Sequence, residues 1–141
     1  MKFKPKRMKG DREMLDDKLF YQMVKDHEAW LADPSKGKPA DFSGMDLKNH
    51  DFVNVDLQKA NFEGADLEGL KFIRCNLAFV NFKHANLTDV IFSKCELYQT
   101  NMQSAKMVDC EFREVLMSKT IMTPKDEQKE RYVSKYVKID D

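Results

Sequence analysis

The sequence predicts an all-β solenoid with four-sided coils, and three observations carry this prediction. From residue 42 to residue 122, a large apolar residue recurs at every fifth position, seventeen times in succession. A second series of mostly small residues lies two positions before each of them. The first twelve large residues alternate strictly between Phe and Leu. A period of five matches neither the 3.6-residue turn of a helix nor the two-residue repeat of a strand.

A short strand followed by a corner explains the five-residue period. Two inward residues with one outward residue between them make a three-residue strand, and the other two residues must turn the chain. Each coil then stacks on the previous one and pairs its backbone groups with it. Several early corners hold residues that suit a positive φ: Gly44, Asn49, Asn54, Gly64 and Gly69. Four later corners lack such residues and are expected to turn differently: Arg74, Phe79, Lys94 and Gln99.

The alternation of Phe and Leu sets the number of sides in each coil. With four repeats per coil, residues twenty positions apart stack, and each column is then nearly pure in residue type. Three repeats per coil would mix Phe and Leu in every column. We therefore expect Phe on two opposite sides and Leu on the other two. One of these columns is the expected core stack of Phe52, Phe72, Phe92 and Phe112.

Three triplets show the repeated motif most clearly: Ala60-Asn61-Phe62, Ala65-Asp66-Leu67 and Ala85-Asn86-Leu87. This motif resembles the A(D/N)LXX pattern of the pentapeptide-repeat family, and the resemblance covers residues 40–122. It implies a right-handed quadrilateral β-helix of about four coils.

The resemblance also bears on function. The best-understood members of the family modulate topoisomerases: they dimerise through the C-terminal end, imitate duplex DNA in shape and negative charge, and bind gyrase. This chain departs from them because its 24 basic and 24 acidic residues give a net charge of zero, and no loop interrupts its repeats. The same neutrality argues against direct binding of nucleic acid. We therefore favour a non-enzymatic protein–protein interaction module with an unknown partner, and keep a DNA-mimicking modulator of gyrase or topoisomerase as the alternative.

The sequence divides into five segments. Residues 1–10 form a basic tail, residues 11–33 a helix with an apolar stripe, and residues 34–39 a linker that contains two prolines. The repeats occupy residues 40–122, and residues 123–141 are expected to form a C-terminal helix and tail. Because a solenoid with open ends exposes its core and strand edges, we expect the N-terminal helix to cap the first coil.

The C-terminal helix is predicted from local signals. Thr123 suits an N-cap, Pro124 the first helical position and Asp126 the third. A helix of about 15 residues is marginal alone, so it must dock on its own solenoid or on a second subunit. Its apolar stripe, the candidate dimer or docking surface, is Tyr132, Val133, Tyr136 and Val137.

The sequence offers no set of residues for catalysis, a metal or a cofactor. Cys75 and Cys95 are expected to stack in adjacent coils as small core residues, and His50 to be a hydrogen-bonded histidine near the N-terminal cap. No apolar run is long enough to span a membrane, so no membrane partner is expected. Three cysteines without framework spacing, and a basic start with no apolar segment after it, indicate a cytoplasmic protein.

The outward residues are unevenly distributed over the four predicted sides. On the Phe42 and Leu47 sides, only Val108 and Ile121 are apolar among the outward positions. The Phe52 and Leu57 sides are adjacent, and an apolar patch there on a soluble monomer is usually covered or used. We expect this side to be an interaction surface. Its candidate cover is the C-terminal helix, either folded back or exchanged between subunits, and we favour the homodimer. The seven apolar outward residues on these sides are Val53, Ile73, Ala78, Phe79, Ile91, Tyr98 and Leu116.

Overall fold

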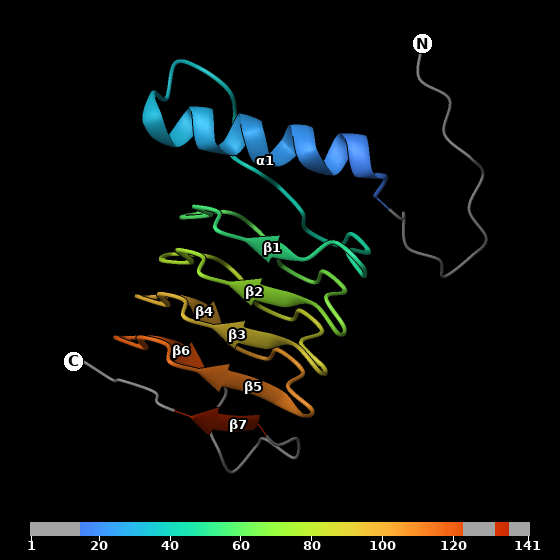
Figure 1. Cartoon of the computed structure of the whole chain (residues 1–141), viewed down its shortest axis with the longest axis vertical. Coiled ribbons are helices and arrows are strands. Elements are labelled where there is room, and N and C mark those ends of the chain that lie inside the picture. Colours follow the sequence, from blue (N-terminus) through green and yellow to red (C-terminus); the bar gives the residue numbers. More distant parts are fainter. Residues whose placement is uncertain (1–14, 123–131, 136–141) are drawn as a thin grey trace.

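The computed structural model describes residues 15–122 and, as a strand, residues 132–135 (Figure 1). The described chain is one helix and a stack of coils whose strands pair in parallel. Five strands form one sheet in the order β1-β2-β3-β5-β7, and β4 and β6 form a second sheet. The elements are α1 (Asp17–Ala32), β1 (Phe52–Val53), β2 (Lys71–Ile73), β3 (Ile91–Ser93), β4 (Asn101–Met102), β5 (Cys110–Arg113), β6 (Ile121–Met122) and β7 (Tyr132–Lys135).

The register of the strands shows that each coil has four sides. β1 pairs with β2, and β2 with β3, at a shift of twenty residues, which places Phe52 beside Phe72 and Phe72 beside Phe92. Where no strand is assigned, adjacent coils pair through isolated bridges with the same shift, such as Asp46 with Asp66. Four five-residue repeats therefore complete one coil, as the alternation of Phe and Leu predicts.

Helix α1 lies across the N-terminal end of the stack (Figure 1). It begins after Asp16, whose side chain accepts a hydrogen bond from the Leu19 N–H at 2.8 Å and so caps the first turn. The helix expected over residues 11–33 is thus present from Asp17 to Ala32. Residues 11–14, like the basic tail, lie outside the described residues.

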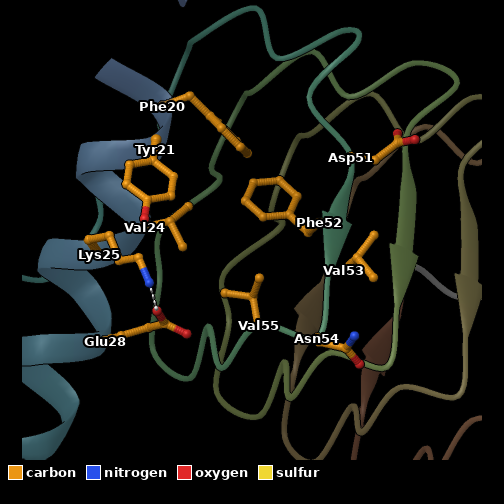
Figure 2. A pocket seen from close by; sticks show the side chains of 10 residues that line it. All are labelled: Phe20, Tyr21, Val24, Lys25, Glu28, Asp51, Phe52, Val53, Asn54 and Val55. Carbon is orange, nitrogen blue, oxygen red and sulfur yellow. Dashed lines mark ion pairs between the residues drawn. The ribbon is translucent and has the colours of Figure 1, made fainter. Parts of the chain in front are cut away.

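The contacts of α1 show that it covers the first coil. Val24 and His27 are its buried residues, and Phe20 packs against the core with its ring centroid 5.0 Å from that of Phe52 (Figure 2). Trp30 is half-buried, and its ring lies 5.6 Å from the His27 ring. The helix shields the apolar end of the solenoid, which would otherwise face water.

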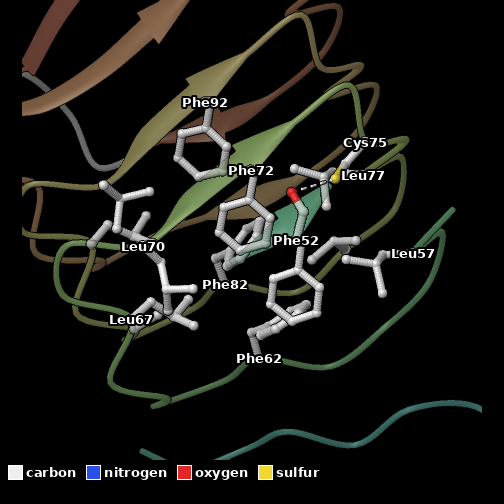
Figure 3. Packing of buried hydrophobic residues seen from close by; sticks show 14 of the residues in the cluster. Phe52, Leu57, Phe62, Leu67, Leu70, Phe72, Cys75, Leu77, Phe82 and Phe92 are labelled. Atoms are coloured by element: carbon white, nitrogen blue, oxygen red, sulfur yellow. Dashed lines mark hydrogen bonds between the residues drawn. The ribbon is translucent and has the colours of Figure 1, made fainter. Parts of the chain in front are cut away.

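The core consists of columns of fully buried side chains. The rings of Phe52 and Phe72 are stacked at 5.0 Å with an interplanar angle of 3°, and Phe92 follows at 5.1 Å (Figure 3). Phe112 continues this stack, 5.2 Å from Phe92. Rings of the neighbouring Phe column meet these edge-on; the Phe52 and Phe62 centroids lie 5.6 Å apart at 88°. Stacked and edge-to-face pairs are both favourable arrangements, so the two columns stabilise each other.

The corners share a positive φ along the whole solenoid, and the turn differs between sides rather than between early and later repeats. The described corners after the Phe52 column lack the turn hydrogen bond that corners on the other sides make, such as the bond from the Val80 N–H to the Leu77 carbonyl at 3.2 Å. Every fifth residue from Gly44 to Lys119 has a positive φ.

The expectation of a different turn at the later corners is wrong, because Phe79, for example, has a φ of 62°. Its N–H donates to the carbonyl of Tyr98 in the next coil at 2.9 Å. Arg74, Lys94 and Gln99 pair their N–H groups with the next coil in the same way, so the ladder between coils overrides the steric preference of the individual residue.

The C-terminal segment differs from the expected helix. Its described part, β7, pairs in parallel with β5, with Cys110 beside Tyr132 and Glu111 beside Val133. The open edge of β5 offers backbone partners, and Tyr and Val favour strands, so pairing outweighs the local helix signals. The other candidate docking residues, Tyr136 and Val137, lie outside the described residues.

Candidate interaction surface

Six of the seven apolar outward residues are accessible on the Phe52 and Leu57 sides. We call these six residues the apolar face. Four are exposed, at 38–45% of their full surface, and two, Ile73 and Ile91, are half-buried. Ala78 is buried at 6% and does not contribute to the surface, which corrects the sequence-based expectation for this residue. The apolar face consists of Val53, Ile73, Phe79, Ile91, Tyr98 and Leu116.

The apolar face is made of two strips on either side of a corner. On the Phe52 side, Val53 pairs with Ile73 in the next coil. On the Leu57 side, the rings of Phe79 and Tyr98 meet edge-on with centroids 5.4 Å apart. The corner between the strips is polar. It is formed by the column Asn54, Arg74, Lys94 and Glu114. A partner that covers both strips must therefore also match the charges of this corner.

The Phe42 and Leu47 sides are polar and tied together by side-chain hydrogen bonds. The Asp or Asn between the inward residues accepts the N–H two residues later, as when Asn86 binds the Thr88 N–H at 3.1 Å. The same residues link coils, since the Asn86 side-chain amide donates to Asp66 at 3.1 Å. Among the described residues of these two sides, Ile121 is the large apolar residue with an exposed side chain, at 49%. These sides offer fixed polar groups rather than apolar contact area.

Lys48 holds the acidic residues of two coils together on the Leu47 side. Its ammonium lies 3.2 Å from the Asp66 carboxylate and 3.9 Å from that of Asp46. Burial works against the ionised form of Asp66, but hydrogen bonds from the Glu68 N–H and from Lys48 outweigh it and lower the pKa of Asp66. The acidic run of the first coils is therefore partly neutralised within the chain.

A groove of about 330 Å³ lies between α1 and the first coil on the apolar side. Tyr21, Val24 and Lys25 line it from the helix, and Phe52 and Val53 from β1 (Figure 2). Lys25 contacts Glu28 at 3.9 Å and lies 5.4 Å from the Tyr21 ring centroid. The sequence gives the apolar stripe of α1 but not its path over the square end of the coil, so the groove cannot be found from the pattern alone.

His27 attaches the helix to the coil by two hydrogen bonds. Its Nδ1 accepts the Ala40 N–H at 2.9 Å, and its Nε2 lies 2.8 Å from the Gln58 carbonyl. This pairing requires a neutral ring with the proton on Nε2. Burial lowers the pKa of His27, although the Gln58 carbonyl and nearby carboxylates oppose this. A histidine in the apolar stripe of a capping helix is the sequence signal for such an attachment.

His50 and the cysteines are internal to the fold. The His50 Nε2 lies 2.6 Å from the Leu15 carbonyl, and its ring stacks on Phe20 at 4.6 Å. Cys75 donates to the Phe52 carbonyl at 3.3 Å (Figure 3). Burial raises the pKa of Cys110. Within the described part of the chain, no three His, Cys, Asp or Glu residues are grouped to hold a metal ion.

Two models of known protein families match the repeats of this chain. The model described as "Pentapeptide repeats (8 copies)" matches residues 40–72, and the model described as "Pentapeptide repeat region" matches residues 65–126. The chain belongs to the pentapeptide-repeat family. Its fold is accordingly the right-handed quadrilateral β-helix, preceded by one helix. The search of curated proteins gave no significant match.

Solved structures agree on the fold. HetL of Nostoc sp. PCC 7120, a pentapeptide repeat protein involved in heterocyst differentiation regulation, matches with a TM-score of 0.53 at 18% identity. The match covers 72% of this chain and 47% of HetL, so the chain spans about half the length of HetL. The pentapeptide repeat protein alr5209 of the same organism matches with a TM-score of 0.50 at 12% identity over 92% of this chain and 99% of that one. At these identities the likeness shows the fold alone.

The described residues contain no helix with the length and apolar character needed to cross a membrane.

Proposed function

We propose that this protein is a non-enzymatic interaction module that binds a partner protein through the apolar face. One observation carries the proposal: four large apolar side chains are at least 38% exposed on two adjacent sides. They are Val53, Phe79, Tyr98 and Leu116. Phe79 and Tyr98 contact each other, and apolar side chains that gather on two adjacent sides of a folded domain often mark an interaction site, which a solenoid presents rigidly.

The arrangement of the polar groups supports a binding role rather than chemistry. The buried side-chain nitrogen and oxygen atoms of the described residues all have hydrogen-bond partners. His27, His50 and Thr100 bind backbone carbonyls, and none of the three lines the groove between α1 and the first coil. A general acid or base must reach the proton that it transfers, and these groups are committed to the fold.

A matched pair of corner variants tests the proposal. Phe79 and His84 occupy equivalent corners and have the same φ of 62°, but Phe79 is on the apolar side and His84 on the polar side. We expect Phe79→Lys combined with Leu116→Lys to abolish capture of proteins that the wild type retains from a lysate of the source cell. The His84→Lys control should capture them like the wild type. Identical capture by all three proteins would contradict the proposal.

A second copy of the chain is the first partner to test, because the best-understood members of the family dimerise. Light scattering over a dilution series measures whether the wild type is a dimer and whether the face variants are monomers. If the wild type is a dimer and Phe79→Lys combined with Leu116→Lys leaves its dissociation constant unchanged, the chain self-associates through another surface. The capture experiment would then decide the role of the apolar face.

Modulation of DNA gyrase or topoisomerase is the second candidate function. Its support is the acidic run of the early repeats, where Asp41, Asp51, Glu63 and Glu68 are exposed. A supercoiling assay with gyrase and micromolar protein tests it. Inhibition or protection that is lost when Asp41 and Glu63 are changed to Lys would support the DNA-mimic role. Unchanged supercoiling at all protein concentrations would remove it.

A further inference from the structure

β1 is the edge strand of the five-stranded sheet at the end that α1 covers. In later coils, the residue equivalent to Asp51 donates its N–H to the preceding coil, as Ile91 does to the Leu70 carbonyl at 3.0 Å. The residue equivalent to Val53 accepts from that coil, as the Ser93 carbonyl accepts the Arg74 N–H at 2.8 Å. No coil precedes β1, so Asp51 and Val53 have no ladder partner on this edge among the described residues.

The groove described above runs along this free edge. Val53, which is exposed at 45%, lines this groove and is also part of the apolar face, where it pairs with Ile73 of the next coil. α1 closes the inner part of the edge, because the Phe20 ring covers Phe52 at 5.0 Å, but leaves the outward part open. A free strand edge beside an apolar groove is the arrangement that proteins use to bind extended segments as an added strand.

We propose that the groove between α1 and β1 binds an extended segment of a partner protein, which adds to the sheet as a parallel strand beside β1 and has the residue order basic, small, apolar. This proposal rests on the proposed interaction function and specifies the form of one contact. The pairs β1–β2, β2–β3 and β3–β5 are parallel and share a shift of twenty residues, so the added strand would continue their columns.

The register defines the chemistry of each of the three positions. The first residue lies beside Asp51, which is exposed, accepts the Lys71 N–H at 3.0 Å and has no ion pair with any described residue. A basic side chain fits there. The second residue points inward, where the Phe20 ring already lies 5.0 Å from the Phe52 ring, so we expect a small residue such as Gly, Ala or Ser there. The third lies beside Val53 in a column that continues to Ile73, where a β-branched or other apolar side chain packs well.

The backbone supplies the remaining contacts. In other coils the inward residue donates its N–H to the outward residue of the next coil, as Phe62 does to the Asn81 carbonyl at 2.7 Å. The small residue of the bound segment should therefore donate to the Asp51 carbonyl. Strand spacing of about 4.8 Å places the segment within the groove, between β1 and the exposed Tyr21.

Selection from a peptide library on the full-length protein tests the proposal. The library displays peptides with three randomised residues flanked by Gly and Ser. The wild type should enrich the order basic, small, apolar by about fivefold per round at the basic position, which is the ratio a good cross-strand ion pair supplies. Asp51→Lys should shift that position to acidic residues, and Asp51→Asn, which keeps the hydrogen-bond acceptor, should remove the charge preference. Val53→Asp should remove the apolar preference.

Synthetic peptides then separate strand addition from general apolar binding. N-methylation of the small residue of the selected peptide should weaken binding about tenfold, measured by fluorescence anisotropy, because it removes the ladder hydrogen bond. No enrichment on the wild type, enrichment of the reverse order, or enrichment unchanged by Val53→Asp would overturn the proposal.

The control Leu116→Lys changes the apolar face outside the groove and should leave peptide selection intact. Failure of peptide selection with continued dependence of partner capture on Phe79 and Leu116 would overturn only the groove proposal. The converse result would overturn the broader role of the apolar face and leave the groove as a separate binding site.

Discussion

The two pairs of sides of this solenoid have nearly the same interior and different exteriors. Phe62, from the Phe42 side, and Phe72, from the Phe52 side, are both fully buried and meet edge-on at 5.9 Å. Outside, the Phe42 and Leu47 sides carry linked Asp and Asn side chains, whereas the Phe52 and Leu57 sides carry exposed Phe79 and Tyr98. The repeat constrains the inward positions, so the differences between the sides accumulate at the outward ones.

The largest expected effect is the loss of a core Phe ring, which should destabilise the protein equally on the two pairs of sides. We expect Phe72→Ala to reduce the free energy of unfolding by about 3–5 kcal/mol, because it removes a ring from a continuous stack and leaves a cavity. Phe62→Ala should cost the same amount, although its column lies under the polar sides. Urea denaturation measures both. A difference of several kcal/mol between the two variants would mean that the two pairs of sides also differ inside.

His27 attaches α1 to both pairs of sides. His27 accepts from Ala40 on the Phe42 side and contacts the Gln58 carbonyl on the Leu57 side. His27→Leu leaves both backbone groups without this partner, and we expect a loss of about 2–3 kcal/mol in unfolding free energy. His84→Leu, at an exposed corner, should change it by less than about 0.5 kcal/mol.

The same histidine should make stability depend on pH. Burial lowers the pKa of folded His27 below its usual 6.5, so below that pH the unfolded chain binds a proton more readily than the folded chain. Stability is therefore complete above pH 6.5 and falls as the pH decreases, by at most about 1.4 kcal/mol per unit. Urea midpoints at pH 7.5, 6.5 and 5.5 should decrease in the wild type, with a weaker dependence in His27→Leu. Equal slopes in both proteins would contradict this assignment.

A lysine introduced on the apolar sides or on the polar sides tests which exterior takes part in self-association. Ile91 and Asn81 are half-buried outward residues at equivalent positions of different sides. For the proposed homodimer, Ile91→Lys on the apolar face should weaken self-association about tenfold relative to the wild type, because a charge must be desolvated in an apolar contact. Asn81→Lys should leave dimerisation unchanged. Light scattering across a dilution series measures both, and a greater effect of Asn81→Lys would assign the dimer contact to the polar sides.

The sequence was sufficient for the interior because burial there depends on a strict period. Seventeen regular positions leave one arrangement that keeps Phe and Leu columns pure. The same reasoning failed where backbone pairing decides the outcome. Local signals after residue 122 predict a helix, but the edge of β5 pairs with Tyr132–Lys135 as a strand. The groove depends on the path of α1 over the coil, which no periodic pattern specifies.

The smallest predicted effect concerns the corners, where the early and later repeats differ most in sequence. Asn54 and Lys94 occupy the same corner column and have the same φ of 56°, but only Asn tolerates this conformation well. We expect Lys94→Asn to raise the free energy of unfolding by about 1 kcal/mol by relieving steric strain.

The reciprocal change Asn54→Lys should lower the free energy by a similar or slightly larger amount, because it also removes the hydrogen bond from Arg74 Nε at 3.0 Å. Urea denaturation of the two single variants and of the double variant measures these effects. Because the two residues lie two coils apart in one column, their effects should add, and the double variant should be close to the wild type. If both single variants were destabilised, the ladder would hold each corner in a conformation fitted to its own side chain. The residue-independent geometry inferred from the shared φ values would then be wrong.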